Sequence, residues 1–311
     1  MTRSRVLEIL RAAGGPVPGP VLAEELGVSR AAVWKQVERL ALAGYRIERD
    51  RERGYRLMES PDRLLPAEIE PRLATKRIGR VLHHFDAIDS TNRAAMERGR
   101  DGGVEGEVFL AEEQTHGRGR LGRSFFSPKG LSLYASILLR PEIPPALGPR
   151  LTLVAGLAVA ETVERHAGER PGLKWPNDVH LAGRKVAGIL TEMEAESDRV
   201  LFVVCGPGVN LNVPEAAFPP ELRSIATSIL AATGRRVDRC AFAADLFLAF
   251  EQAYDLFLAR GFGALRERWD AYSMLGGREV RVESGGDAVE GTALGIDDEG
   301  ALRLRTRSGE Q

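Results

Sequence analysis

The sequence is poor in the residues that build disulfide frameworks and metal clusters. Its 311 residues include only two cysteines, Cys205 and Cys240, which are far apart in the chain. Its five histidines show no ligand spacing. A disulfide-stabilised or metal-organised fold is therefore disfavoured, and a reducing, cytoplasmic location is the simplest interpretation.

Long apolar runs and a large excess of charge of one sign are missing as well. No run reaches membrane-spanning length, and the N-terminus begins with a helical pattern instead of a signal peptide. We therefore expect an intracellular protein with no membrane partner. The formal net charge of -1 argues against a protein that coats nucleic acid, although opposite charges on separate domains can cancel. A chain of 311 residues has room for two or three domains.

Several motifs of covalent and hydrolytic chemistry are absent. The sequence contains no glycine-rich loop ending in Gly-Lys-Ser/Thr, no G-x-S-x-G elbow and no metalloprotease histidine pair. The sequence therefore offers no candidate residue for a covalent enzyme nucleophile. Chemistry by positioning and by neutralisation of developing charge remains open.

Residues 1–60 have the pattern of a winged helix-turn-helix domain. Helices are expected over residues 6–12, 21–26 and 30–43, and strands over 45–48 and 54–57. Ser29 stands where the N-cap of the third helix belongs. The two strands, with the charged tip at residues 49–53, form the wing.

The cations of this domain predict DNA binding. The expected contact residues lie on the third helix and on the wing: Ser29, Arg30, Trp34, Lys35, Arg51 and Arg53. A protein-binding or dimerisation domain of the same shape is the alternative, and Trp34 could equally be a partly buried packing residue. Because the local charge excess is small, we expect weak, salt-sensitive binding by one copy, so that specific regulation requires a dimer on two half-sites.

Residues 61–270 mix strands and helices. Strands are expected over residues 81–85, 108–112, 131–139, 186–194 and 200–205, and long helices over 151–166 and 240–260. The pattern predicts an α+β or mixed α/β domain with a largely antiparallel sheet.

An arginine-bearing glycine segment at residues 117–122 spells G-x-G-x-x-G. A dinucleotide-binding motif would open a helix and have an acidic residue about 20 positions later, and neither is found here. The segment instead predicts a mobile loop whose Arg118, Arg120 and Arg123 bind anions. A surface or RNA-binding arginine run is the alternative.

The segment 174–178, Lys-Trp-Pro-Asn-Asp, is followed seven residues later by Lys185. Asn177 and Asp178 offer oxygen ligands suited to Mg²⁺ or to orienting Lys174. Lys185 projects from an apolar strand in which Gly188 allows a ligand to approach the backbone closely. Such a group suits a site that holds a polyphosphate and its metal while a carboxylate is activated. The alternative is a structural segment in which the lysines are solvated and Trp175 lies in the core.

Two further clusters complete the candidate site. Ser90 and Thr91 precede a helix, where a plain N-cap is the alternative to a ligand contact. Residues 205–212 end an apolar strand with Gly206 and Gly208, followed by Asn210 and Asn212 as polar groups.

On these motifs the chain resembles the biotin–protein ligases, strongly over residues 89–212 and loosely over nearly its whole length. The N-terminal segment resembles that of the bifunctional ligases that also repress the biotin operon. The resemblance implies a class II synthetase-like central domain at residues 61–270 and a small SH3-like β-barrel at 271–311. The family's barrel usually continues into one more strand, so the resemblance implies that either the domain itself or the sequence in hand is trimmed at Gln311.

The resemblance also implies residue roles. Ser90, Thr91 and Gln114 would bind the ureido head of biotin, in a slot shaped by Gly117, Gly188, Gly206 and Gly208. Arg118, Arg120 and Lys185 would be catalytic and would bind the biotin carboxylate and the phosphates. The ATP side would comprise Arg120, Arg123, Phe125, Asn177, Lys185 and Asn210, with Phe125 stacking on adenine and Asp178 near the metal.

The function so implied is ATP-dependent formation of biotinyl-5′-AMP and transfer of biotin to a lysine of a carrier protein. ATP, Mg²⁺ and biotin would be required, and the partners would be the biotin carboxyl carrier domain of acetyl-CoA carboxylase, operator DNA and a second copy of the chain in a ligand-promoted homodimer. Two alternatives remain open, a biotin-sensing repressor without ligase activity and a lipoate or octanoate transferase.

Overall fold

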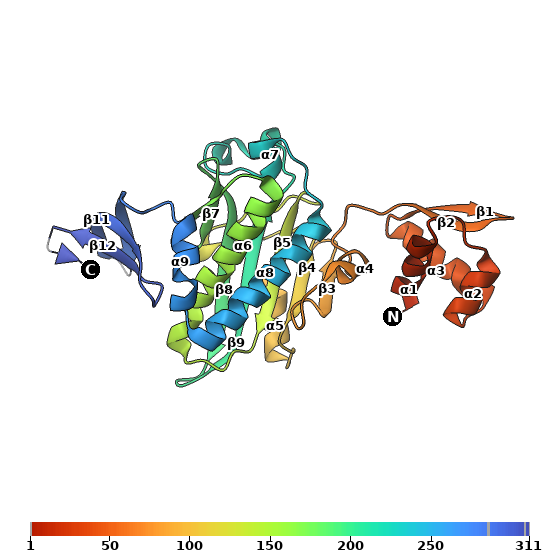
Figure 1. Ribbon diagram of the computed structural model, residues 1–311, viewed down its shortest axis with the longest axis horizontal. Helices are drawn as coiled ribbons and strands as arrows, with labels where there is room; N and C mark the ends of the chain where they lie inside the picture. Colours follow the sequence, from red (N-terminus) through yellow and green to blue (C-terminus); the bar gives the residue numbers. More distant parts are fainter. Residues whose placement is uncertain (1, 285–286, 308, 311) are drawn as a thin grey trace. The chain divides into compact units, whose positions relative to one another are not determined.

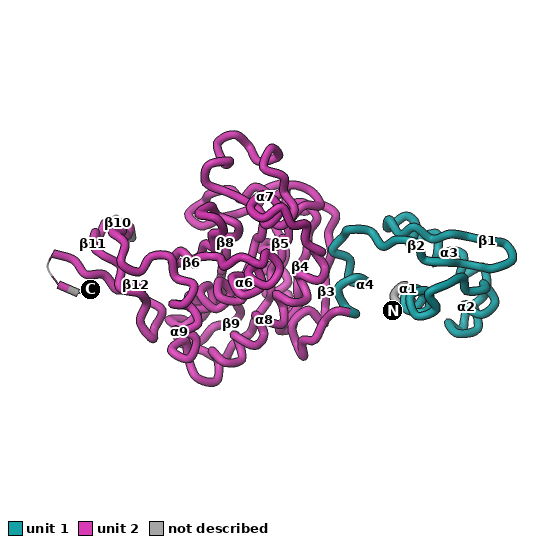
Figure 2. Tube along the Cα trace, turned by 45° about the horizontal axis from the view of Figure 1, so that its top comes forward, with its two compact units in different colours: residues 1–71 teal, residues 72–311 magenta. Residues whose placement is uncertain are grey.

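The computed structural model describes residues 2–284, 287–307 and 309–310. The chain forms two compact units, residues 1–71 and residues 72–311 (Figure 2). The first boundary therefore lies after Pro71 instead of near residue 60, and residues 271–311 belong to the same compact unit as the central domain.

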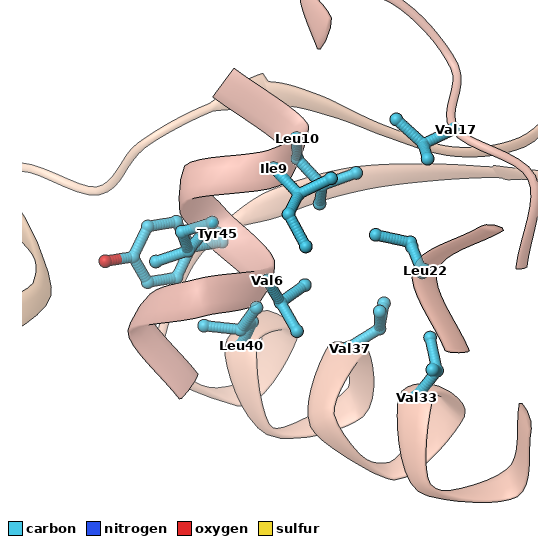
Figure 3. Packing of buried hydrophobic residues seen from close by; sticks show 10 residues of the cluster. Val6, Ile9, Leu10, Val17, Leu22, Val33, Val37, Leu40 and Tyr45 are labelled. Atoms are coloured by element: carbon cyan, nitrogen blue, oxygen red, sulfur yellow. The ribbon is translucent and has the colours of Figure 1, made fainter. Parts of the chain in front are cut away.

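The first unit is a winged helix-turn-helix domain, as the sequence predicts. It contains α1 (Thr2–Ala13), α2 (Gly19–Leu26), α3 (Arg30–Leu42), β1 (Arg46–Asp50), β2 (Gly54–Glu59) and α4 (Pro66–Ile69). Apolar side chains from the first three helices point toward one another in its core (Figure 3). Ser29 caps α3, because its hydroxyl accepts a hydrogen bond from the Ala32 N–H at 3.2 Å. Helix α2 begins two residues earlier than expected, since a proline is tolerated in a first helical turn.

The second unit is built on a seven-stranded sheet of order β3-β4-β5-β9-β8-β7-β6. Its strands are β3 (Val81–Phe85), β4 (Glu107–Ala111), β5 (Ser132–Leu139), β6 (Gly172–Lys174), β7 (Asp178–Leu181), β8 (Arg184–Ala195) and β9 (Val200–Asn210). Only β3 and β4 are parallel, which confirms the predicted, largely antiparallel sheet.

Helices cover this sheet and connect its strands. Helices α6 (Leu151–Ala167) and α8 (Arg239–Arg260) lie side by side across one face (Figure 1). Helix α5 (Thr91–Arg100) packs through Ala95 against Phe109, Leu138 and Phe202. Two further helices, α7 (Ile229–Thr233) and α9 (Gly263–Tyr272), and the hairpin of β6 and β7 were not expected from the sequence.

The segment Pro145–Ala167, which contains α6, is long and apolar enough to cross a membrane by length and composition alone. The expectation that no apolar run reaches that length is therefore wrong, although the helix itself was expected over residues 151–166. Its most apolar window is 67% buried, so α6 is a core helix of the second unit.

Strand β9 is the element that most directly shapes the site. It was expected to end at Cys205, but it continues through Gly206-Pro207-Gly208 to Asn210. Its pairing with β5 is interrupted there, because Tyr134 pairs with Gly208 and the next pair is Ile137 with Cys205. Pro207 has no N–H to donate to a neighbouring strand. The ladder is therefore interrupted at residues 135–136 and 206–207, with the same register on both sides.

The C-terminal part is an antiparallel sheet of β10 (Glu279–Ser284), β11 (Asp287–Ile296), β12 (Leu302–Thr306) and β13 (Gly309–Glu310). Leu275, Ala293 and Leu304 form its small core, and Trp175 packs against that core. The Trp175 indole also donates a hydrogen bond to the Gly300 carbonyl at 3.1 Å. Trp175 thus links the β6–β7 turn to the small β-domain, which the expectation of a core tryptophan did not specify.

A buried ion pair holds the strand that leads into the site. Arg239, at the start of α8, donates to Glu112 Oε2 at 2.8 Å and to the Ser132 carbonyl at 3.2 Å. The two side chains are 0% and 2% exposed. Arg239 thereby fixes the end of β4 beside the start of β5, just before Gln114.

We predict that Arg239→Met lowers the free energy of unfolding by about 3–5 kcal/mol, because the buried Glu112 carboxylate loses its guanidinium partner. Urea unfolding followed by circular dichroism measures this. The control is Arg199→Met, which removes an exposed pair with Glu196 and should cost less than about 1 kcal/mol. Equal losses in the two variants would contradict the role given to Arg239.

Candidate functional site

A pocket lies beside the interrupted pairing of β5 and β9, since Ala135, Gly206 and Pro207 line it. It is small, at about 50 Å³. Its lining comes from the start of α5, the arginine loop at residues 117–123, and strands β5, β8 and β9. The residues are Ser90, Thr91, Asn92, Gln114, Arg118, Gly119, Arg120, Phe125, Tyr134, Ala135, Asn177, Lys185, Gly188, Ile189, Leu190, Gly206, Pro207 and Gly208.

The floor of the pocket is a buried polar cluster. The Thr91 N–H and hydroxyl both lie within hydrogen-bond distance of Gln114 Oε1, at 2.9 and 3.0 Å. Ser136 Oγ lies 2.8 Å from Thr91 Oγ1 and 2.6 Å from Asn92 Oδ1. Gln114 Nε2 donates to Ser127 at 3.2 Å. Such a floor can both donate to and accept from a small polar ring, whereas it is a poor surface for an alkyl chain.

Ser90 occupies the N-cap position of α5, but its side chain makes no capping hydrogen bond. The side chain is buried and lines the pocket. The plain N-cap interpretation of the Ser-Thr pair is therefore wrong for the Ser90 hydroxyl, which is available to a ligand.

Three cations reach the pocket, and each has a partner. Lys185 Nζ lies 2.6 Å from Asp178 Oδ1. Arg118 makes a two-pronged contact with Glu192, with nitrogen–oxygen distances of 3.0 and 2.9 Å. Arg120 donates to the neutral Asn177 Oδ1 at 3.2 Å. Asp178 therefore orients Lys185, and it also lies directly opposite Lys174 in the β6–β7 hairpin.

Glycines let these groups come together. A Cβ on Gly206 would lie 1.9 Å from Asn92 Oδ1, and one on Gly208 would lie 2.8 Å from the Phe125 ring. A Cβ on Gly188 would lie 3.0 Å from the Lys185 ammonium. Gly117 does not line the pocket, contrary to expectation. A side chain there would lie 2.4 Å from the Phe125 carbonyl, so Gly117 serves the folding of the loop.

The arginine loop is held by backbone hydrogen bonds and by the contacts of Arg118 and Arg120 with Glu192 and Asn177. Its base is closed by the hydrogen bond from the Phe125 N–H to the Gly117 carbonyl at 2.8 Å and by the Arg118–Ser124 bridge. At its tip Leu121 adopts a left-handed conformation with φ 55° and is 89% exposed. Such a conformation is unfavourable for a bulky side chain. The loop therefore has little packing to keep it in a single position.

An adjoining hollow of about 410 Å³ shares Phe125 and Lys185 with the pocket. Arg123, Lys174, Asp178 and Asn210 also line it. The Asn210 amide nitrogen donates to the Thr227 carbonyl at 3.0 Å, while its buried Oδ1 has no partner among the described residues. Asn212, in contrast, is occupied with the Val237 backbone on both sides of its amide and does not line this hollow.

Two nearby groups stay uncharged at neutral pH. Burial lowers the pKa of His180, which lines the adjoining hollow. Burial raises the pKa of the Cys205 thiol to about 12, so that it remains protonated. Neither group adds charge to the site. No cluster of three or more histidine, cysteine, aspartate or glutamate side chains that could hold a metal occurs among the described residues.

Ser136 and Glu192 contact residues of the pocket and were not expected from the sequence. Asn92 directly follows Ser90 and Thr91 and belongs to the same polar cluster before α5. Ser136 and Glu192 each lie within an apolar strand, and only the packing of that strand against α5 reveals their role.

In the first unit the expected DNA contacts are exposed. Arg30, Lys35, Arg51 and Arg53 are exposed, and Trp34 is 51% exposed, which argues against the packing interpretation of Trp34. Arg30, Trp34 and Arg51 line a common hollow between α3 and the wing, together with Arg49, which sequence reasoning missed. The Ser29 hydroxyl is engaged as a helix cap. Arg30, Arg49 and Arg51 thus face one concave surface.

Comparison with known proteins matches three segments of the chain to three families of domains. The Biotin/lipoate A/B protein ligase family matches residues 84–210, an HTH domain matches residues 2–56, and the Biotin protein ligase C terminal domain matches residues 275–311. The bifunctional ligase/repressor BirA of Bacillus subtilis (strain 168) is 40% identical over 308 residues, covering 99% of this chain and 95% of that protein. BirA of Escherichia coli (strain K12) is 33% identical, covering 92% and 87%.

A solved structure agrees as well. The biotin protein ligase from Aquifex aeolicus in complex with biotin and ATP matches with a TM-score of 0.65 and 29% identity, covering 75% of this chain and 94% of that chain.

The contact between β9 and Asn92 gives a test of the pocket floor. We predict that Gly206→Ala lowers the free energy of unfolding by about 2–4 kcal/mol, because the methyl group displaces Asn92 from its buried partners. The control is Gly276→Ala, where a Cβ meets nothing within 4 Å. Chemical denaturation of both variants measures the effect, and a stable Gly206→Ala protein would refute the packing described.

Proposed function

This chain belongs to the biotin–protein ligases of the bifunctional ligase/repressor type, and we propose that its pocket joins biotin to ATP before transfer to a carrier lysine. The single observation that carries the proposal is the convergence of Arg118, Arg120 and Lys185 on one small pocket with a buried polar floor.

The floor binds the ureido head of biotin. Ser90, Thr91 and Gln114 provide hydroxyl and amide groups that match a ring with two N–H donors and one carbonyl acceptor. Asn92 and Ser136 fix the orientation of Thr91 from behind. This polar floor also favours biotin over lipoate or octanoate, whose chains would bury polar groups without partners.

The cations activate the acid. The biotin carboxylate attacks the α-phosphorus of ATP, the bond to the β-phosphate oxygen breaks, and pyrophosphate leaves with biotinyl-5′-AMP formed. Lys185 lines both the pocket and the adjoining hollow, where the carboxylate and the α-phosphate would meet, and Arg120 lines the pocket. Their charge is set before the reaction begins, which is the arrangement that stabilises developing negative charge.

The adjoining hollow takes the nucleotide. Phe125 offers a ring face for adenine, Asn210 offers an amide oxygen without a partner among the described residues, and Arg123 and Lys174 offer cations to the phosphates. Magnesium enters as part of the Mg·ATP substrate. Asp178 and Asn177 suit it, since one carboxylate plus phosphate oxygens is a usual magnesium environment.

In the second step the ε-amine of a carrier lysine attacks the acyl carbon, and AMP leaves. The acceptor we assign is the biotin carboxyl carrier domain of acetyl-CoA carboxylase. Until that step the arginine loop closes over the adenylate.

The N-terminal domain makes the protein a biotin-responsive repressor. Ordering of the arginine loop by the adenylate favours a homodimer, and the dimer places two α3 helices on operator half-sites. We place the protein in the cytoplasm, in keeping with its two buried free cysteines.

Lys185→Ala should abolish biotin-dependent exchange of pyrophosphate into ATP, because the group that binds both reacting oxygens is gone. Isotope exchange measures this, and circular dichroism checks that the fold is kept. The control Lys129→Ala removes an exposed lysine outside the pocket and should leave exchange unchanged. Undiminished exchange in Lys185→Ala would contradict the role of Lys185.

Arg51→Ala should weaken DNA binding to all sequences alike and reduce the slope of log affinity against log salt by about 1, as expected for one lost phosphate contact. Gel shifts at several salt concentrations, with biotin and ATP present, measure the slope. Arg260→Ala, an exposed change in the second unit, is the control. An unchanged slope would remove Arg51 from the interface.

A further inference from the structure

We propose that Glu192 is an internal counter-anion of the pocket, which holds Arg118 when no ligand is bound and yields it to the carboxylate of biotin. Glu192 would then be a specificity-determining residue, because only an anionic ligand can take its place on Arg118. The proposal rests on the proposed function, in which biotin is the ligand.

The position of Glu192 makes it part of the site. It lies on β8, two residues beyond Leu190, and side chains two apart in a strand lie on the same face. Leu190 lines the pocket. Arg118 Nη1 lies 3.0 Å from Glu192 Oε2, and Arg118 Nη2 lies 2.9 Å from Glu192 Oε1. This bidentate arrangement is the strong geometry for an arginine–carboxylate pair.

This pairing limits the charge that the pocket presents to a ligand. Asp178 neutralises Lys185, and Glu192 neutralises Arg118. Arg120 is the remaining cation among the lining residues, and its described partner is the uncharged Asn177. The pocket and these two carboxylates therefore carry a single net positive charge. A carboxylate that binds Arg118 must first compete with Glu192.

Asn92 makes this exchange possible without stranding a buried charge. Its amide nitrogen donates to Glu192 Oε2 at 3.0 Å and to the Leu190 carbonyl at 3.1 Å. Glu192 therefore keeps a hydrogen-bond donor after Arg118 has left. The other side of the Asn92 amide accepts from Ser136, which contacts Thr91. Glu192 is thus connected, through Asn92 and Ser136, to Thr91 in the pocket floor that would bind the ureido ring.

The exchange has a consequence that a purely structural role would lack. Biotin must break the Arg118–Glu192 pair, whereas biotinamide, which has the same ring and chain but no charge, leaves it intact. In Glu192→Gln the guanidinium keeps a weaker, neutral partner. The preference for biotin over biotinamide should therefore increase in this variant.

The test is calorimetric titration of the full-length protein with biotin and with biotinamide, without ATP. We expect the ratio of the two dissociation constants to favour biotin at least fivefold more in Glu192→Gln than in the wild-type protein. The matched control is Glu194→Gln, on the same face of β8, whose carboxylate pairs with Arg100 away from the pocket. It should keep the wild-type ratio.

Glu192→Asp keeps the charge and should stay close to the wild-type ratio, which tests the proposal independently of how stable Glu192→Gln is. An unchanged or reduced ratio in Glu192→Gln, including equal weakening of both ligands, would overturn the proposal and leave Glu192 a structural residue. Failure of the wild-type protein to bind biotin would instead overturn the proposed function.

Discussion

The close approach of Asn92 and Phe125 to the glycines of β9 is the constraint on which the site depends. Asn92 and Phe125 occupy the volume that side chains at positions 206 and 208 would fill. The pocket lies beside these glycines, where the pairing of β5 with β9 is interrupted. The sheet thus supplies the rigid support that a binding site needs.

Charge is the second organising feature. The carboxylates of Asp178 on β7 and Glu192 on β8 hold the Lys185 and Arg118 cations at the pocket. Cations held in this way need little reorganisation when negative charge develops on a substrate. The arginine loop adds the opposite property, since its exposed tip leaves it able to move over a bound ligand.

The sequence was sufficient for the parts whose signal is local. Helix periodicity, the Ser29 cap and the glycine-spaced arginines were readable, and the clustering of Lys185 with Gln114 and Thr91 followed from the family resemblance. The continuation of β9 past Cys205 was not readable, because Gly-Pro-Gly ordinarily ends a strand. Glu192 and Ser136 were missed because their role depends on which face of a strand meets α5. The contact of Asp178 with Lys185 was missed because it depends on the pairing of β7 with β8.

The proposed ligase function is tested most directly by incubating the protein with labelled biotin, ATP and a biotin carboxyl carrier domain, and measuring label on the carrier. We expect covalent label on the carrier lysine only when ATP is present, and no transfer of labelled lipoate or octanoate. Biotin that binds to the protein but is never transferred would contradict it and would indicate a sensor without ligase activity.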